Sequence, residues 1–128
     1  MKNIKETLVY RWFDEVWNKG NEAAINEIFH PEGKAHGLVD NDLIGPDSFR
    51  PFFYTFRNDF SNINIVIEDL IIEGDKQVAR CSVTAKHNST GKNVDFTGIS
   101  ISKIKDGMII EAWNCFDFLR MTQQLTAQ

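Results

Sequence analysis

The first part of the chain carries its apolar residues at the spacing of amphipathic helices. From Ile4 to Asn18 they recur every three or four positions, and Gly20 follows as a helix-ending residue. The stretch 21–29, NEAAINEIF, repeats this spacing more briefly and stops before Pro31. The pattern predicts a long first helix and a short second helix.

A third helix is predicted to begin at Pro46, because proline is favoured in the first helical turn. The segment between Pro31 and this point has no clear period and is predicted to be irregular. Beyond Pro46, five phenylalanines recur at helical spacing and form one stripe. They are Phe49, Phe52, Phe53, Phe56 and Phe60. A helix with this much aromatic surface must pack against a large apolar layer.

The second half of the chain changes to the alternation that is typical of strands. Its runs are rich in Ile, Val and Thr, and the short turn sequences EGDK, NSTGK and KDGM separate them. The predicted strands are Ile63–Glu73, Gln77–His87, Asn93–Lys105 and Met108–Phe118. Connections this short join antiparallel neighbours. The order predicts an α+β fold, with three N-terminal helices on one face of a curved antiparallel sheet, and a single domain over 1–128.

Polar residues interrupt the apolar pattern of these strands, and Asp117 between Phe116 and Phe118 is the clearest case. Alternation places Asp117 on the same strand face as Trp113 and Cys115. An unpaired charge inside a core is costly, so this carboxylate belongs either at the surface or in a functional pocket. Mixed faces of this kind fit a sheet that lines a cavity, and they also fit an ordinary sheet with one wet face.

Composition excludes several classes of function. The net charge is −4 and no basic cluster occurs, which argues against binding to nucleic acid or to an anionic membrane. Neither a leader peptide nor an apolar run long enough for a membrane helix is predicted, so we expect a cytoplasmic protein. The two isolated cysteines, Cys81 and Cys115, are expected to be small buried hydrophobic residues, with a disulfide, metal or nucleophile role left open.

Four stretches in a fixed order point to a known family. They are VYRWFDEVWNKGNEAAINEIFHPEGKAHG, GPDSFRPFF, IEDLIIEGDKQVAR and TGKNVDFTGISISKIKDGMIIEAWNCFDFLRMTQQL. The last contains Glu111, Trp113 and Asp117, followed by Gln124 and Leu125. The combination resembles the SnoaL-like polyketide cyclases, or ester cyclases, of the nuclear-transport-factor-2-like (NTF2-like) superfamily. This resemblance implies a cone-shaped fold, a deep apolar pocket for a small molecule and a homodimer packed through the sheets.

The resemblance also implies a chemistry. In characterised cyclases the aspartate of the last-strand motif is the acid/base for an intramolecular aldol ring closure on an aromatic polyketide ester, without metal or organic cofactor. That aspartate corresponds to Asp117. Independently of the family, desolvation by Phe116, Phe118 and Trp113 would raise the pKa of this carboxyl towards the value that suits a general base.

Further residues are candidates for the same pocket. His36, in the sequence KAHGL, and Arg80, near the start of the second predicted strand, are candidate partners of Asp117 in catalysis. Each has a structural alternative, a surface position for His36 and an ion pair for Arg80. Other candidates for the pocket wall are Trp17, Phe53, Phe56, His87, Ser100, Trp113 and Cys115.

Two other functions stay open. A ketosteroid-isomerase-like proton transfer would use a tyrosine on the first helix, but the matching position is Phe13. A non-catalytic protein that binds an apolar small molecule would use the same fold without a base. The placement of Asp117 distinguishes an enzyme from a non-catalytic binding protein. A pocket-facing carboxylate near His36 or Arg80 favours an enzyme, whereas a carboxylate that caps the final FLRMTQQL segment does not.

Overall fold

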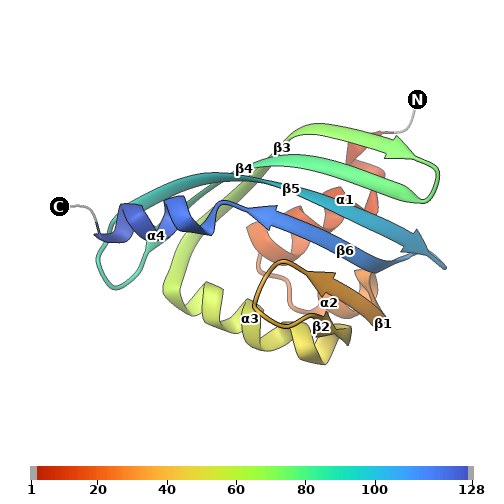
Figure 1. The fold of residues 1–128 in the computed structure, drawn as a ribbon, viewed down its shortest axis with the longest axis horizontal. Helices are drawn as coiled ribbons and strands as arrows, with labels where there is room; N and C mark the ends of the chain where they lie inside the picture. The colour runs from red at the N-terminus through yellow and green to blue at the C-terminus, as the bar shows by residue number, and fades with distance from the viewer. Residues whose placement is uncertain (1–2, 127–128) are drawn as a thin grey trace.

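The helices of residues 4–59 lie together against one face of a curved, six-stranded sheet, and the C-terminal helix lies apart from them at one end of the sheet (Figure 1). The structure is a computed structural model and describes residues 3–126. The helical segments are η1 (Ile4–Glu6), α1 (Leu8–Arg11), η2 (Trp12–Asn18), α2 (Ala23–Ile28), α3 (Gly45–Asp59) and α4 (Phe118–Thr126). None of the helices in this part of the chain is long and apolar enough to cross a membrane.

The sheet has the strand order β2-β1-β6-β5-β4-β3. Its strands are β1 (Phe29–His36), β2 (Leu43–Ile44), β3 (Phe60–Glu73), β4 (Lys76–His87), β5 (Asn93–Lys105) and β6 (Met108–Phe116). The strands β3 to β6 form the predicted antiparallel meander. The α+β fold class is therefore confirmed.

The segment after the second helix differs from its prediction. Residues 31–45 were expected to be irregular, yet they contain most of β1 and all of β2. β1 runs parallel to β6, so the sheet is mostly antiparallel instead of wholly so. Pro31 and Gly33 hide this strand in the sequence, because both residues are rare inside strands. The pairing survives with a register shift between Phe29 and Lys34.

The predicted first helix is divided into three pieces at Thr7 and Trp12. Thr7 has an extended backbone, and its hydroxyl caps α1 by accepting a hydrogen bond from the Tyr10 N–H at 3.2 Å. From Trp12 onward the helix is of the wider π type, so the Lys19 N–H donates to the Asp14 carbonyl five residues earlier. The spacing of apolar residues in the sequence, interpreted with the α-helical period of 3.6 residues, could not reveal this change from α to π helix at Trp12.

The last predicted strand also ends early. β6 stops at Phe116, and the chain then turns into α4, which lies beside β5. At this turn the Phe116 ring packs directly on the backbone of Gly98 in β5. A Cβ atom at position 98 would lie only 2.2 Å from this ring, which is too close for any other residue. Glycine at this position therefore lets the Phe116 ring lie over β5 and face the helices.

The core between helices and sheet is strongly aromatic. The Trp17 ring contacts the rings of Phe49, Phe52, Phe53 and Phe56, which α3 presents to it. Phe49 is only 1% exposed and also contacts Trp12. The predicted phenylalanine stripe thus packs as expected, although its last member, Phe60, belongs to β3.

Candidate functional site

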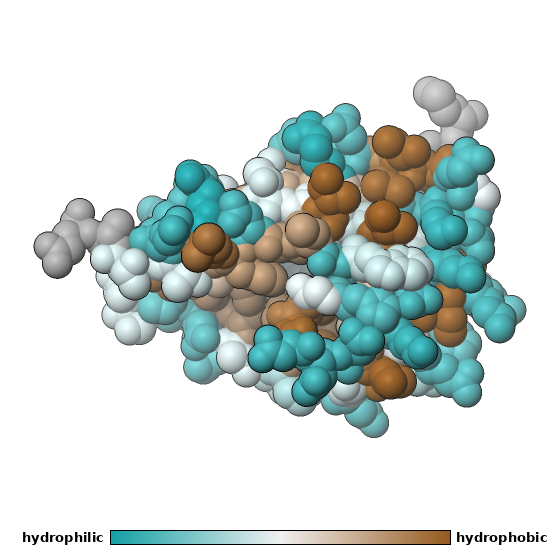
Figure 2. All heavy atoms as spheres, viewed as in Figure 1, coloured by the Kyte–Doolittle hydropathy of each residue, from teal (hydrophilic) through white to brown (hydrophobic). Residues whose placement is uncertain are grey.

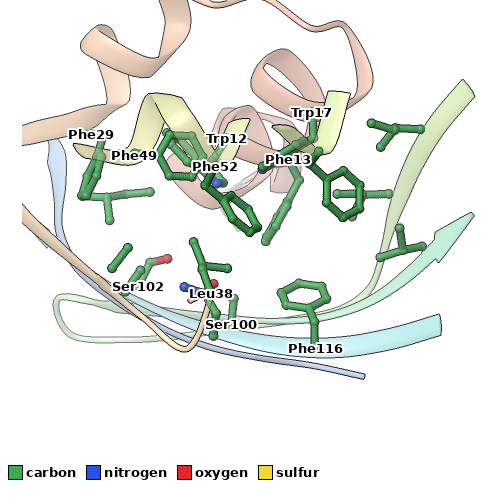
Figure 3. Close-up of a pocket in the computed structure, with 18 of the residues that line it drawn as sticks. Trp12, Phe13, Trp17, Phe29, Leu38, Phe49, Phe52, Ser100, Ser102 and Phe116 are labelled. Atoms are coloured by element: carbon green, nitrogen blue, oxygen red, sulfur yellow. The ribbon is translucent and has the colours of Figure 1, made fainter. Parts of the chain in front are cut away.

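An apolar cavity lies between the helices and the inner face of the sheet (Figure 3). Its free volume is about 70 Å³. The lining residues are Trp12, Phe13, Trp17, Phe29, Ala35, Leu38, Phe49, Phe52, Phe56, Ile63, Ile65, Val83, Phe96, Ser100, Ser102, Ile109, Ala112, Asn114, Phe116 and Phe118. Within the described range, 3–126, this lining contains no titratable side chain.

The cavity is small for a ligand site. Pockets that hold drug-sized ligands usually measure about 300–1,000 Å³, and a cavity that admits benzene measures about 150 Å³. At about 70 Å³, this space takes only a compound of a few heavy atoms unless a wall moves. The phenylalanines of α3 therefore fill most of the space between the two layers.

One polar chain crosses the sheet side of the cavity wall. The Ser100 hydroxyl donates to Asn114 Oδ1 at 3.0 Å, and Asn114 Nδ2 donates to the backbone carbonyl of His36 at 3.0 Å. Both ends of the Asn114 amide are therefore used, and the side chain is fixed between β5 and β1.

Ser102 differs from Ser100, its neighbour two residues earlier on the same face. Ser102 is 2% exposed, and no group in residues 3–126 is placed to hydrogen-bond with its hydroxyl. Figure 3 shows this residue on the sheet wall with its oxygen towards the cavity. On the opposite wall, the indole N–H groups of Trp12 and Trp17 also lack hydrogen-bond partners among the described residues.

Asp117 does not face this cavity, contrary to the expectation. Its side chain is exposed and caps α4, where Oδ1 accepts a hydrogen bond from the Arg120 N–H at 3.0 Å. The alternation used to place Asp117 with Trp113 and Cys115 holds, but that face is the outer one. The inner positions of β6 are Ala112, Asn114 and Phe116.

His36 also lies on the outer face, since the preceding residue, Ala35, lines the cavity. Its Nε2 is 2.6 Å from Glu111 Oε2 and its Nδ1 is 2.9 Å from Asp42 Oδ1. The hydrogen bond to Glu111, followed by the one to Asp42, raises the pKa of His36 above its usual value. We name these three side chains the His36 clasp, because they tie the connection after β1 to β6.

The outer face carries a second, open hollow. It is lined by Arg80, Thr97, Gly98, Ile99, Cys115, Phe116 and Asp117. The structure thus brings Asp117, Arg80 and Cys115 together, but outside the cavity. Arg80 is 52% exposed and donates from Nε to Asp69 Oδ2 at 2.6 Å, which is the ion pair left open as its alternative. Cys115 is exposed, so the burial expected for it is wrong, whereas Cys81 is buried.

The remaining candidates divide between the two faces. Trp17, Phe56 and Ser100 line the cavity, and Phe53 is buried beside Trp17 without lining it. His87 ends β4, where its Nδ1 lies 2.9 Å from the Thr90 hydroxyl, away from the cavity.

Trp113 is on the outer face and is 38% exposed, with its ring stacked on the His36 ring at 5.7 Å. It is therefore no part of the cavity wall.

Sequence reasoning missed several wall residues. Ser102 and Asn114 share faces with Phe96 and Phe116, and these aromatic neighbours were the available signal that this face points inward. Leu38 gave no signal, because it lies in the connection between β1 and β2. The residues His36, Asp42 and Glu111 are also not arranged to hold a metal ion, and no other group of such ligands is found in residues 3–126.

The comparisons with known proteins agree with this architecture. The sequence model described as SnoaL-like polyketide cyclase matches residues 7–125. The chain belongs to the SnoaL-like polyketide cyclase family. A candidate polyketide cyclase from Bacillus cereus ATCC 10987 is 35% identical, with a TM-score of 0.82, over 92% of this chain and 77% of that one. No curated protein matches the chain.

More distant structures show that the SnoaL-like chain has the NTF2-like fold. A SnoaL-like polyketide cyclase candidate from Jannaschia sp. CCS1 superposes with a TM-score of 0.85 at 22% identity, over 94% of this chain and 90% of that one. A protein from Catenulispora acidiphila DSM 44928 with a ketosteroid isomerase-like fold, solved with trimethylamine, gives 0.81 at 12% identity, over 93% and 92%.

Proposed function

We propose that this SnoaL-like protein binds a small, neutral, largely apolar organic compound in the cavity between helices and sheet. The observation that carries the proposal is the composition of the wall, which is aromatic and aliphatic with a few uncharged polar groups. Transferring a charged ligand into such a space would leave its charge without a counter-ion, which is strongly unfavourable. A neutral compound gains from leaving water and loses little.

The size of the cavity and one distant relative support a small ligand. A volume of about 70 Å³ suits a compound of a few heavy atoms. The Catenulispora protein, which shares the fold at 12% identity, was solved in complex with trimethylamine, a molecule of that size. For the present chain we propose an uncharged compound, because its cavity offers no carboxylate to an amine.

A pair of substitutions tests this proposal. Ala112→Leu puts extra atoms into the cavity, whereas Thr97→Leu adds similar atoms on the outer face of the adjoining strand. Small ketones and alkenes should shift the methyl NMR signals of Leu38 and Ile109 in the wild type and in Thr97→Leu. We expect no such shifts in Ala112→Leu. Equal binding by all three proteins would place the ligand elsewhere and refute the proposal.

Cyclase chemistry at Asp117 is the second candidate function. Family membership favours it, whereas the role of Asp117 as the cap of α4 does not. In this proposal Asp117 is the acid/base, with Arg80 beside it in the outer hollow and His36 as a further proton donor. The substrate would be an enolisable ester or ketone.

Turnover of aromatic keto-esters by the wild type and by Asp117→Asn tests this candidate. A loss of turnover in the variant, with unchanged stability, supports Asp117 as the base. Turnover that persists in Asp117→Asn would exclude Asp117 as the base. If the wild type binds these compounds without turning them over, only the proposed binding function remains.

We also propose that the outer face pairs two copies of the chain. The strand register aligns Ile71, Val78, Ile101 and Trp113 in one apolar row across four strands, and Ile71 is 60% exposed. An exposed apolar row of this kind favours association, because pairing two copies removes its apolar area from water. Sedimentation equilibrium should show a dimer for the wild type and a monomer for Trp113→Lys. A monomeric wild type would refute the pairing.

A further inference from the structure

Ser102 is the one hydroxyl of the sheet wall that is buried and free of a protein partner within residues 3–126. It is 2% exposed and lines the cavity. A hydroxyl in an apolar surrounding is costly unless it is hydrogen-bonded. The position therefore favours a ligand, or a water molecule that a ligand displaces, as the partner of Ser102.

The neighbours of Ser102 do not hydrogen-bond with it in the described residues. In the register, Ser102 lies between Gln77 of β4 and Ala112 of β6. The Gln77 side chain is held by the Val9 N–H, which donates to its Oε1 at 3.0 Å, and it makes no hydrogen bond with Ser102 within residues 3–126. Alanine has no polar side-chain atom. The nearest polar pair on the same wall, Ser100 and Asn114, is already internally bonded.

The chemistry of Ser102 and its surroundings limits the chemical class of ligand that the cavity can bind. A serine hydroxyl donates one hydrogen bond, which suits a single carbonyl or hydroxyl oxygen. It does not suit a carboxylate, whose charge needs a counter-ion in an apolar space, and no charged side chain lines the cavity in residues 3–126. The remaining wall is apolar and fits the rest of such a compound.

We propose that Ser102 selects, within the small-molecule site inferred above, ligands that carry one carbonyl or hydroxyl oxygen on an apolar body. The ligand oxygen accepts the hydrogen bond from Ser102 Oγ. The inference rests on the proposed binding function. It adds the chemical class of the ligand and identifies Ser102 as the residue that hydrogen-bonds with the ligand oxygen. Ser102 acts here as a specificity-determining residue and takes no part in a covalent step.

Two compounds of the same shape test the proposal. 2-Butanone and 2-methyl-1-butene differ only in an oxygen that replaces a CH₂ group. Their dissociation constants are measured by NMR titration of the methyl groups of Leu38, Ile109 and Ala112. We expect Ser102→Ala to weaken 2-butanone binding roughly 5- to 20-fold, the effect of one lost hydrogen bond. The alkene should bind within about twofold of its wild-type affinity.

The matched control is Ser82→Ala, which removes a hydroxyl from the outer face of the neighbouring strand β4. Ser82 does not line the cavity, so the ratio of ketone to alkene affinity should stay at the wild-type value. Ser102→Cys, which keeps the shape with a weaker donor, should give an intermediate ratio and covers the case in which Ser102→Ala folds poorly.

The outcomes separate the two proposals. If both compounds bind the wild type and the ratio is the same in Ser102→Ala, the role of Ser102 is overturned while the binding site stands. If neither compound shifts the cavity methyl signals in the wild type, the binding function and this inference fail together.

Discussion

The two faces of the sheet differ in chemistry more than in shape. The inner face meets the helices and encloses a cavity whose wall is free of titratable groups within residues 3–126. The outer face carries His36, Arg80 and Asp117, each engaged with a neighbouring protein group. Figure 2 shows apolar patches beside strongly polar areas on this face.

This difference shows that a shift of one residue along a strand decides whether a side chain is assigned to the cavity or to the outer surface. Asn114 lines the cavity and Cys115 is exposed on the other side. Adjacent residues therefore belong to the cavity wall and to the outer surface. A functional assignment that rests on a strand motif must first establish which face meets the core.

The largest expected effect comes from truncating one residue on each face of β5. Phe96, 3% exposed, faces the core and Ile99, 47% exposed, faces outward. Phe96→Ala should lower the free energy of unfolding by about 3–5 kcal/mol, and Ile99→Ala by about 0.5 kcal/mol or less. Urea denaturation measures both. Comparable losses that depend on protein concentration would show that Ile99 is also buried in the dimer interface proposed above, beyond the row from Ile71 to Trp113.

A smaller effect is expected at the cap of α4. Asp117→Ala removes the side chain that accepts from the Arg120 N–H, which should cost about 0.5–2 kcal/mol. Asp117→Asn keeps an acceptor and should be nearly neutral. Thermal unfolding of the two variants makes the comparison. An equal loss in both would mean that the charge of Asp117, and not its capping geometry, stabilises this end of the chain.

The smallest effect concerns pH and the His36 clasp. Since Glu111 and Asp42 raise the pKa of His36 in the folded state, the clasp stabilises fully below the unfolded pKa of about 6.5. This stabilisation is lost as pH rises through the higher folded value.

The free energy of unfolding of the wild type relative to His36→Gln should therefore be highest below about pH 6.5 and fall as pH rises above this value and through the higher folded pKa. Chemical denaturation across these pH values measures it, with Asp42→Asn as a second variant that weakens one arm of the clasp. A difference that stays constant or grows with pH would contradict the expected sign.

The meander and the phenylalanine helix could be predicted because their periods are long and strong. β5 was located at its observed ends, Asn93 and Lys105, and Pro46 marks the start of α3 within one residue. The parts that failed depend on contacts between distant segments. β1 exists because it pairs with β6, and the π-helical turn from Trp12 leaves no trace in a list of apolar positions.

The candidate site shows the same limit. Alternation grouped Asp117 correctly with Trp113 and Cys115. Phe116 was only a weak signal of which group faces the helices, because the opposite face carries Trp113. The decisive fact is the packing of Phe116, made possible by Gly98 on the neighbouring strand. That pair is distant in sequence and close only after folding, so single-sequence reasoning could not weigh it.

Leu38 has a consequence for how such a protein can change. Among the described residues that line the cavity, it alone lies in a connecting loop instead of a helix or strand. Insertions in loops cost little folding free energy, whereas a new rotamer in the aromatic core disturbs many neighbours. A change of length between Gly37 and Asp42 would therefore enlarge or close the chamber while leaving the scaffold intact. Evolution and protein engineering both have, in this short turn, an adjustable boundary for ligand size.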